Sequence, residues 1–390
     1  MNKINAEYGF SQLNHAGEHL CGDHVDVITQ EDNSKIIVIA DGLGSGVKAS
    51  ILSTLTAKLI STMIDAGIGL EECVKTVVAT LPINKDHGVA YCTFTIFHIK
   101  ENHFVEIVQY ENPDVIFLRN GKTFDYPVLE VKVEDKILKV TEVELEPGDI
   151  LVGMSDGVPY ANAEEAYNYD WTPKNIAEFV LTMNEGGYTA KNIAALLVDE
   201  CNKLYGEKPR DDVTACIIKA RPYTELNVLF GPPKNLDDGP FMMELFFNQS
   251  GKHAICGGTT ARIAGCYLKK PVLRGKNFVE TDLPPMSNIE GVDLVTEGVL
   301  TMSRVSEYLE DYLGENKLFW ERNSKKDGAG YLYRLMVEEA TKINFFVGTA
   351  ANPAHHNDML ELGLNYKMKL VKDITNGLKT LGKSVTVEYF

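Results

Sequence analysis

The chain has 390 residues, which is the length of two or three ordinary domains. Hydrophobic residues make up 44% and charged residues 24% of the sequence, and this composition excludes a collagen-like, coiled-coil or disordered chain. The formal net charge of −17 disfavours nucleic acid and anionic lipid as partners, because a field of that sign repels both.

The first 220 residues mix short apolar strands with amphipathic helices. The strands are expected over residues 35–40, 91–99, 103–110, 115–119, 137–145, 149–154 and 213–219. The helices are expected over residues 49–66, 70–80, 172–183 and 190–205. Asn120-Gly121 is a strong hairpin signal, and Thr172-Pro173 is typical of a helix start. Strands that follow one another through tight turns are antiparallel, so this segment predicts an α+β body.

The pattern changes near residue 221. From there on the chain reads as strand, loop and helix units, with strands expected over residues 226–230, 253–256, 292–295 and 342–347. Such alternation requires crossover connections and therefore a mainly parallel sheet. The sequence thus predicts two domains built differently: residues 1–220, and an α/β domain over residues 221–390.

Membrane segments, leaders and disulfides are not expected. The most apolar stretch, residues 51–70, is interrupted by Lys58 and Asp65, and a membrane span needs about 18 apolar residues with few or no charges. The N-terminus lacks the apolar core of a secretory signal. Seven cysteines occur without a Cys-x-x-Cys pair, which favours a reduced, cytoplasmic protein.

Acidic residues stand at the ends of several predicted strands. Asp41-Gly42 and Asp156-Gly157 each end an apolar strand, while Asp23 and Asp211 each stand just before one. An Asp-Gly pair by itself is usually a plain turn. Carboxylates brought together repel one another and lose solvation unless a counter-ion joins them. Because Mg²⁺ and Mn²⁺ prefer carboxylate, carbonyl and water oxygens, the pattern favours a divalent cation site.

The order of these motifs is more specific than any one of them. In chain order they are Gly22-Asp23, Ala40-Asp41-Gly42-Leu43-Gly44-Ser45-Gly46, Cys92-Thr93-Phe94, Asn112-Pro113-Asp114, Ser155-Asp156-Gly157 and Asp211-Asp212-Val213-Thr214. The series resembles the PPM family of metal-dependent protein phosphatases. It looks most like the bacterial branch named for stage II sporulation protein E, and the resemblance covers about residues 1–220.

This resemblance implies a four-layer sandwich in which helices flank two antiparallel sheets, with two Mn²⁺ or Mg²⁺ ions at one end. Asp41 would bridge both metals, the carbonyl of Gly42 would join Asp23 on one of them, and Asp156 and Asp211 would complete the other. Asp41 and Asp156 are the expected catalytic residues. A water activated between two cations would then attack protein phosphoserine or phosphothreonine, on a phosphorylated bacterial regulatory protein.

Some roles remain open. No arginine is assigned to the substrate phosphate and no general acid is assigned, although His19 and His24 are candidates. Asp26 is either a further ligand or an ordinary strand residue. In the enzyme class, a phosphatase with an aspartyl nucleophile is disfavoured because Asp41 does not belong to an Asp-x-Asp motif. In a different class, a catalytically silent module that binds phosphoproteins is the alternative to the phosphatase.

Two other local patterns resemble ligand sites. The glycine-rich segment over residues 42–48 lacks the Gly-Lys-Ser/Thr end of a Walker A loop and is better explained as a turn into a helix. A zinc site is conceivable at a group of soft ligands, although their spacing matches no known finger. The group consists of His15, His19, Cys21 and His24.

The second domain contains one further candidate site. A Gly-Gly-Thr-Thr turn at residues 257–260 opens a predicted helix after a predicted strand. Helix N-termini offer free N–H groups to anions, and open parallel sheets bind ligands beyond the carboxyl ends of their strands. Tight strand-to-helix turns also use Gly and Thr for purely structural reasons. If the turn binds a ligand, we expect a small anion or nucleotide-like regulator on Thr259, Thr260 and Arg262.

Overall fold

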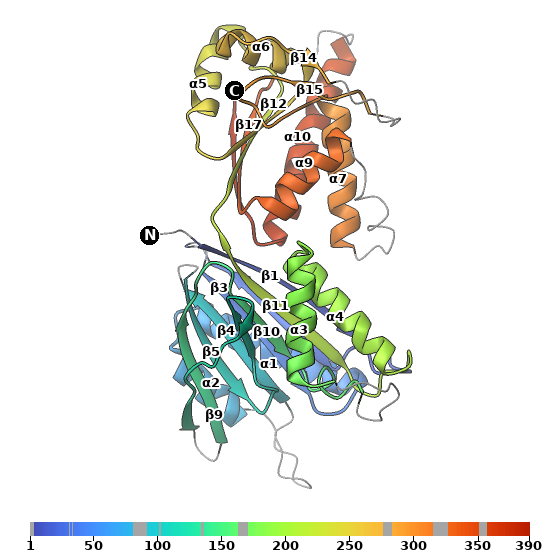
Figure 1. Ribbon diagram of the computed structural model, residues 1–390. Helices are drawn as coiled ribbons and strands as arrows, with labels where there is room; N and C mark the ends of the chain where they lie inside the picture. Colours follow the sequence, from blue (N-terminus) through green and yellow to red (C-terminus); the bar gives the residue numbers. More distant parts are fainter. Residues whose placement is uncertain are drawn as a thin grey trace. The chain divides into compact units, whose positions relative to one another are not determined.

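Figure 1 shows the computed structural model of the chain. The structure describes residues 4–30, 32, 34–80, 92–100, 103–133, 136–162, 171–275, 283–314, 327–350 and 357–390. The chain divides into two compact units, Met1–Pro222 and Tyr223–Phe390. The boundary predicted near residue 221 lies within two residues of this division.

Unit 1 contains two antiparallel sheets. The six-stranded sheet has the order β2 (Asp23–Thr29), β3 (Lys35–Gly42), β4 (Cys92–Lys100), β5 (Phe104–Tyr110), β9 (Lys136–Glu144) and β8 (Leu129–Val133). The five-stranded sheet has the order β1 (Ile4–Leu13), β11 (Val213–Pro222), β10 (Ile150–Met154), β6 (Ile116–Arg119) and β7 (Lys122–Thr123). The helices are α1 (Gly46–Asp65), α2 (Leu70–Thr80), α3 (Pro173–Glu185) and α4 (Ala190–Leu204). The prediction of mixed α and β structure with antiparallel sheets is confirmed.

Strand β3 shows how unit 1 is layered. Its alternate side chains point to opposite faces, and both faces are buried. Ile36 and Val38 pack in one core with residues of α1 and α2, whereas Ile37 and Ile39 pack in another with residues of the five-stranded sheet, such as Leu151. A third core joins α3 and α4 to the outer face of the five-stranded sheet. The continuous apolar run of β3 follows from burial on both sides.

Strand β1 was not among the predicted strands. It pairs antiparallel with β11 over ten positions, from Ile4 opposite Pro222 to Leu13 opposite Val213. Its buried carboxylate, Glu7, accepts a hydrogen bond from the backbone N–H of Ala190 and pairs with Arg221. A polar strand of this kind is stabilised by partners distant in sequence, which a local hydrophobic pattern does not reveal.

Helix α1 buries a face made of small residues. Its buried positions include Ala49, Ser53 and Ala57, which let the helix lie close to β2 and β3. A row of larger apolar residues one helical turn apart is exposed instead: Val47, Ile51, Leu55 and Leu59. Of the described helices, α1 alone has the length and composition that would let it cross a membrane. Its packing on the sheet is also what a core helix of unit 1 would show, so the absence of a membrane partner stays a prediction.

The buried Lys35 predicts a pH dependence of stability. Lys35 is only 1% exposed, and burial lowers the pKa of its amino group from the ordinary value of 10.5 to about 8. Between these two values the unfolded chain binds more protons than the folded chain, so the free energy of unfolding rises with pH there and is unaffected below about pH 8. Lys35→Met is therefore expected to be more stable than the wild type near neutral pH. This advantage shrinks by up to roughly 3 kcal/mol as the pH approaches 10.5, the pKa of this lysine in the unfolded chain.

Urea unfolding of both proteins across this range measures the effect. Lys75→Met is the matched control, because the Lys75 side chain is 53% exposed and burial does not contribute to the effect of its replacement. A pH-independent difference for Lys35→Met would contradict the prediction.

Unit 2 is an α/β body around one mainly parallel sheet. The sheet has the order β14 (Leu273–Arg274), β15 (Ser287–Asn288), β16 (Leu294–Thr296), β13 (Lys252–Cys256), β12 (Glu225–Phe230), β17 (Lys342–Val347) and β18 (Ser384–Tyr389). The strands from β16 to β18 pair in parallel, and the short edge strands β14 and β15 pair antiparallel. The helices are α5 (Gly239–Phe247), α6 (Gly258–Leu268), α7 (Val299–Leu313), α9 (Gly328–Arg334), a π-helical turn (Leu335–Glu339) and α10 (Asn357–Thr380), with a 3-10 turn at Leu236–Asp238.

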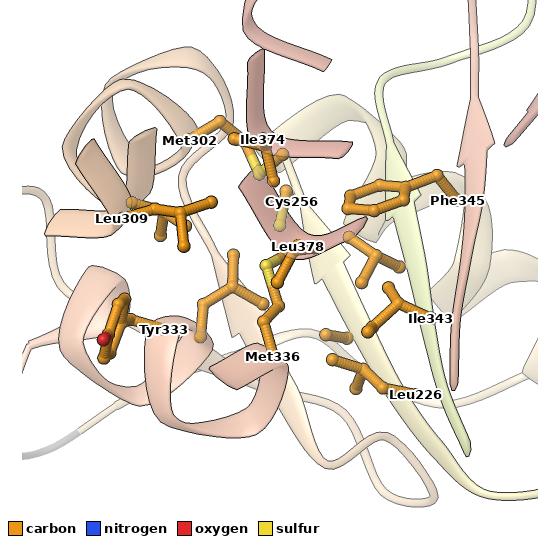
Figure 2. Close-up of a cluster of buried hydrophobic side chains, with 14 of the residues drawn as sticks. Leu226, Cys256, Met302, Leu309, Tyr333, Met336, Ile343, Phe345, Ile374 and Leu378 are labelled. Carbon is orange, nitrogen blue, oxygen red and sulfur yellow. The ribbon is translucent and has the colours of Figure 1, made fainter. Parts of the chain in front are cut away.

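The larger core of unit 2 lies between the sheet and three helices. Figure 2 shows Ile343 and Phe345 of β17 and Leu226 of β12 gathered with side chains of α7, α9 and α10, such as Leu309 and Ile374. A smaller core on the opposite face holds residues of α5 and α6. Helices cover both faces of the sheet. Helices α6 and α7 begin at the carboxyl ends of the parallel strands β13 and β16.

Candidate functional site

Aspartates far apart in the sequence come together at one end of the two sheets in unit 1. Asp23 begins β2 and stands directly opposite Asp41 near the end of β3. Asp156 lies two residues after β10, and Asp211 lies two residues before β11. Because β10 and β11 are neighbours, the last two residues are brought to the same end of their sheet.

A pocket of about 190 Å³ lies at this end of unit 1. Three of the four predicted aspartates line it, namely Asp41, Asp156 and Asp211. The remaining lining residues are Leu43, Gly44, Cys92, Thr93, Glu111 and Asn112. Asp23 is only 4% exposed and is not among the lining residues. The pocket wall is therefore rich in oxygen atoms that can coordinate a cation.

The carboxyl groups of the site are electrostatically crowded. Burial is the main cause that raises the pKa of Asp41, and the nearby Asp23, Asp156 and Asp211 raise it further. Burial and the neighbouring Asp156 likewise raise the pKa of Asp211, to about 6. Burial also raises the pKa of Asp156 and that of Asp23. A bound cation would stabilise the negative charge of these four carboxyl groups.

Asp23 is held in place by hydrogen bonds from neighbouring strands. The hydroxyl of Thr214 donates to Asp23 Oδ2 at 2.6 Å and accepts from Gln12 Nε2 at 3.1 Å. Gln12 also donates to the backbone carbonyl of Asp23 at 3.1 Å. The backbone N–H of Thr214 donates to Ser155 Oγ at 2.9 Å. Thr214 thus ties Asp23 to the segment that carries Asp156.

Asp212 does not line the pocket, but its charge acts on Asp23 and Asp211, and the sequence prediction did not include it among the ligands. It is 2% exposed, and its Oδ1 accepts the backbone N–H of His15 at 2.9 Å. Its Oδ2 is buried and has no hydrogen-bond partner among the described residues. A buried carboxylate oxygen without a partner is costly, and a cation is one group that would satisfy it.

Gly42 and Gly157 permit tight turns at the site. A Cβ atom on Gly42 would lie 2.4 Å from the backbone oxygen of Ala49, and one on Gly157 would lie 2.2 Å from that of Asp212. The backbone N–H of Gly42 donates to the carbonyl of Gly22 at 3.3 Å. These contacts explain why glycine follows each aspartate, and the role of the Gly42 carbonyl as a metal ligand stays a prediction.

The donor set fits Mg²⁺ or Mn²⁺ in its chemistry, because carboxylate oxygens dominate it. Among the residues that the structure describes, no three His, Cys, Asp or Glu side chains are already gathered as a group that could hold a metal ion. The carboxylates therefore lie close enough to interact electrostatically, but they do not form a closed coordination shell. For the same reason, the described part of the chain offers no support for zinc at His15, His19, Cys21 and His24.

Asp26 is engaged elsewhere in unit 1. Its carboxylate accepts a hydrogen bond from Lys58 Nζ at 2.8 Å and another from the hydroxyl of Ser61, both on α1. It does not line the pocket, and neither do His19 and His24. Of the two readings of Asp26, the structure favours the ordinary strand residue.

Glu111 is a pocket residue that the sequence analysis missed. It directly follows β5, lines the pocket and adopts a left-handed backbone conformation, with φ of 56°. Its neighbour Asn112 accepts a hydrogen bond from the hydroxyl of Thr93 and donates to that of Thr95 at 3.2 Å. A run of polar residues after an apolar strand was the signal that could have drawn attention to Glu111.

Comparison with known proteins gives a consistent result for unit 1. Residues 31–221 match the family model described as stage II sporulation protein E. The chain is 23% identical to stage II sporulation protein E of Bacillus subtilis (strain 168) over 220 residues, which is 52% of this chain and 24% of that protein. It is 23% identical to the protein of the same description from Priestia megaterium over 229 residues, 54% of this chain and 36% of that protein. The matches thus span well under half the length of these relatives.

Solved structures are also similar to part of the chain. The structure of the PP2C phosphatase domain and a fragment of the regulatory domain of SpoIIE from Bacillus subtilis covers 57% of this chain and 64% of that chain, with a TM-score of 0.47 and 19% identity. The catalytic domain of the serine threonine protein phosphatase PstP, in complex with two manganese ions, covers 56% of this chain and 99% of that chain, with a TM-score of 0.40 and 14% identity. Over residues 31–221, the sequence of unit 1 is therefore similar to the stage II sporulation protein E family.

Proposed function

We propose that unit 1 is a metal-dependent protein serine/threonine phosphatase. The observation that carries the proposal is that Asp41, Asp156 and Asp211, which come from distant parts of the sequence, line one small pocket. The negative charges of these neighbouring carboxylates favour the binding of divalent cations, and residues 31–221 match the family model of stage II sporulation protein E.

In this proposal Asp23, Asp41, Asp156, Asp211 and the carbonyl of Gly42 hold two Mn²⁺ or Mg²⁺ ions. When bound, such ions lower the pKa of a water molecule and stabilise the charge that develops on a phosphoryl group. The chain itself supplies the positioning. Thr214 and Gln12 fix Asp23, and the glycine turns hold the strand ends in close contact with their neighbours.

The proposed substrate is a phosphoserine or phosphothreonine side chain on a bacterial regulatory protein. Its support is the similarity to relatives named for sporulation, because the residues that line the pocket do not distinguish one phosphoprotein from another. We propose a cytoplasmic setting, because the seven cysteines are free thiols and most of them are buried.

The expected result of the first test is hydrolysis of p-nitrophenyl phosphate and of a phosphoserine peptide that depends on added Mn²⁺ or Mg²⁺. A chelator should reduce the rate to background, and Mn²⁺ in excess should restore it. Activity that survives chelation would exclude the two-metal mechanism. Binding of a phosphoprotein without turnover under either metal would instead favour the catalytically silent module.

A further inference from the structure

The carboxyl edge of the sheet in unit 2 brings two helix N-termini together. Strands β13 and β16 are parallel neighbours, with Cys256 opposite Thr296. The backbone N–H of Gly257, which leads into α6, donates to the carbonyl of Thr296 at 3.0 Å. A Cβ atom on Gly298, which leads into α7, would lie 3.4 Å from Cα of Gly257. The two glycine turns are therefore packed against each other.

The first turn of α6 presents free backbone donors. The helix has 11 residues, and Gly257 caps it without a side-chain hydrogen bond. Within the described residues, the backbone N–H groups of Gly258, Thr259 and Thr260 have no recorded acceptor. Gly258 and Thr259 are exposed, and the space where a Cβ atom on Gly258 would lie is open. An anion in solution can reach this helix end, where the helix dipole favours negative charge.

The hydroxyl of Thr260 is a second and independent sign of a ligand. Thr260 is 0% exposed, and its Oγ1 is buried without a hydrogen-bond partner in the described structure. This oxygen lies 3.2 Å from the position that a Cβ atom on Gly257 would take, so it points toward the glycine turn. An unpaired buried hydroxyl is destabilising. A ligand oxygen at the helix end would satisfy it.

Charges of both signs flank this turn. Arg262 is exposed on α6, and its Nη2 lies 3.4 Å from Oγ1 of Thr259, so its guanidinium stands beside the helix end. Glu297 follows β16, and its Oε2 accepts the backbone N–H of Leu300 at 2.9 Å. A bare anion would be attracted by Arg262 and repelled by Glu297. A ligand with both a phosphate and hydroxyl groups would suit both residues, because a carboxylate accepts hydrogen bonds from hydroxyl groups.

We propose that this edge of unit 2 binds a small phosphate ester that carries hydroxyl groups, of the nucleoside monophosphate class. The phosphate is held by the first amides of α6, by the hydroxyl of Thr260 and by Arg262, and a sugar hydroxyl donates to Glu297. The site is confined to unit 2 and does not depend on the activity proposed for unit 1.

Isothermal titration calorimetry on the full chain tests this site, with AMP, ribose 5-phosphate and inorganic phosphate as probes. The chain carries Asp41→Asn and the buffer contains a chelator, so that the candidate metal site in unit 1 does not contribute. We expect AMP and ribose 5-phosphate to bind, and inorganic phosphate to bind about tenfold or more weakly than either. Absence of binding by all three probes would overturn the proposal, and equal affinities would overturn the assignment to an ester.

Two variants test the contacts. Thr260→Val and Arg262→Gln are each expected to weaken AMP binding by about tenfold or more, because each removes a donor to a charged group. Thr260→Val should also raise the melting temperature of the ligand-free chain, because it removes an unpaired buried hydroxyl. Thr56→Val is the matched control, since the Thr56 hydroxyl in unit 1 is likewise buried without a partner. It should leave AMP affinity unchanged. Unchanged affinity in Thr260→Val would contradict the site.

Discussion

Asp41→Asn is expected to reduce metal-dependent phosphatase activity to the level of the chelated wild type. Asp41 lines the pocket together with Asp156 and Asp211, and its carboxylate is the proposed bridge between the cations. The same substitution should stabilise the metal-free protein. Burial raises the pKa of Asp41, so this carboxyl disfavours folding increasingly as the pH rises above its ordinary value of 3.8, and Asn removes that effect.

Steady-state hydrolysis and thermal unfolding with and without Mn²⁺ measure both effects. Wild-type protein should gain melting temperature on addition of Mn²⁺, and Asp41→Asn should gain much less. The control is Asp199→Asn on α4, where the carboxylate is 58% exposed and pairs with Lys203 at 2.8 Å. It should retain full activity and the full metal response. Full activity in Asp41→Asn would exclude the role assigned to Asp41. A lower metal-free melting temperature than the wild type would contradict the expected effect of its burial.

Asp149→Asn is expected to cause a large loss of stability in unit 1. The Asp149 side chain is 1% exposed and accepts hydrogen bonds from Arg119 Nε at 2.9 Å and Nη2 at 2.6 Å. It also accepts the backbone N–H of Glu146 at 2.7 Å, which closes the turn before β10. The substitution would leave Arg119 with only the more exposed carboxylate of Glu146, at 3.0 Å, as an ion-pair partner. Loss of the buried partner is expected to cost about 3 kcal/mol in the free energy of unfolding.

Chemical denaturation followed by far-ultraviolet circular dichroism measures this loss. The guanidinium of Arg119 also lies over the ring of Phe124 at 4.6 Å, so it cannot turn to solvent without losing that contact. The matched variant is again Asp199→Asn, whose exposed pair should contribute less than about 1 kcal/mol. Similar losses in the free energy of unfolding of the two variants would contradict the prediction that burial makes the Asp149–Arg119 pair more stabilising.

Features that depend on a few neighbouring residues were predictable from the sequence. Asn120-Gly121 forms the predicted hairpin with φ of 53° and 72°, a conformation that these two residue types tolerate best. Thr172 caps α3 with Pro173 in its first turn, as predicted. The long apolar strand β3 and its neighbours also follow from local pattern. In each case the physical cause lies within a few residues of the signal.

Features that depend on distant partners were harder to predict. The apolar spacing in α1 correctly predicts a helix, yet it does not reveal that small residues such as Ala57 face the sheet while Leu55 is exposed. The positions of Glu111 in the pocket and of Asp212 beside Asp23 depend on where β5 ends and β11 begins, which no local pattern encodes. The order of motifs and the family resemblance predicted that Asp41, Asp156 and Asp211 come together. Local pattern alone could not predict it, because the folded sheets set the distances between these residues.

The seven thiols differ in exposure, so the protein can be labelled with a fluorophore at one site without mutagenesis. Of the seven cysteines, Cys266 is exposed, Cys21 is partly exposed and the other five are buried. Burial raises the pKa of Cys21 above its usual range, which suppresses its thiolate. A maleimide fluorophore at neutral pH should therefore attach almost exclusively to Cys266, on α6. The dye would then sit on the same helix whose first turn forms the proposed phosphate ester site, and its emission would report occupancy of unit 2 while phosphatase turnover is followed separately.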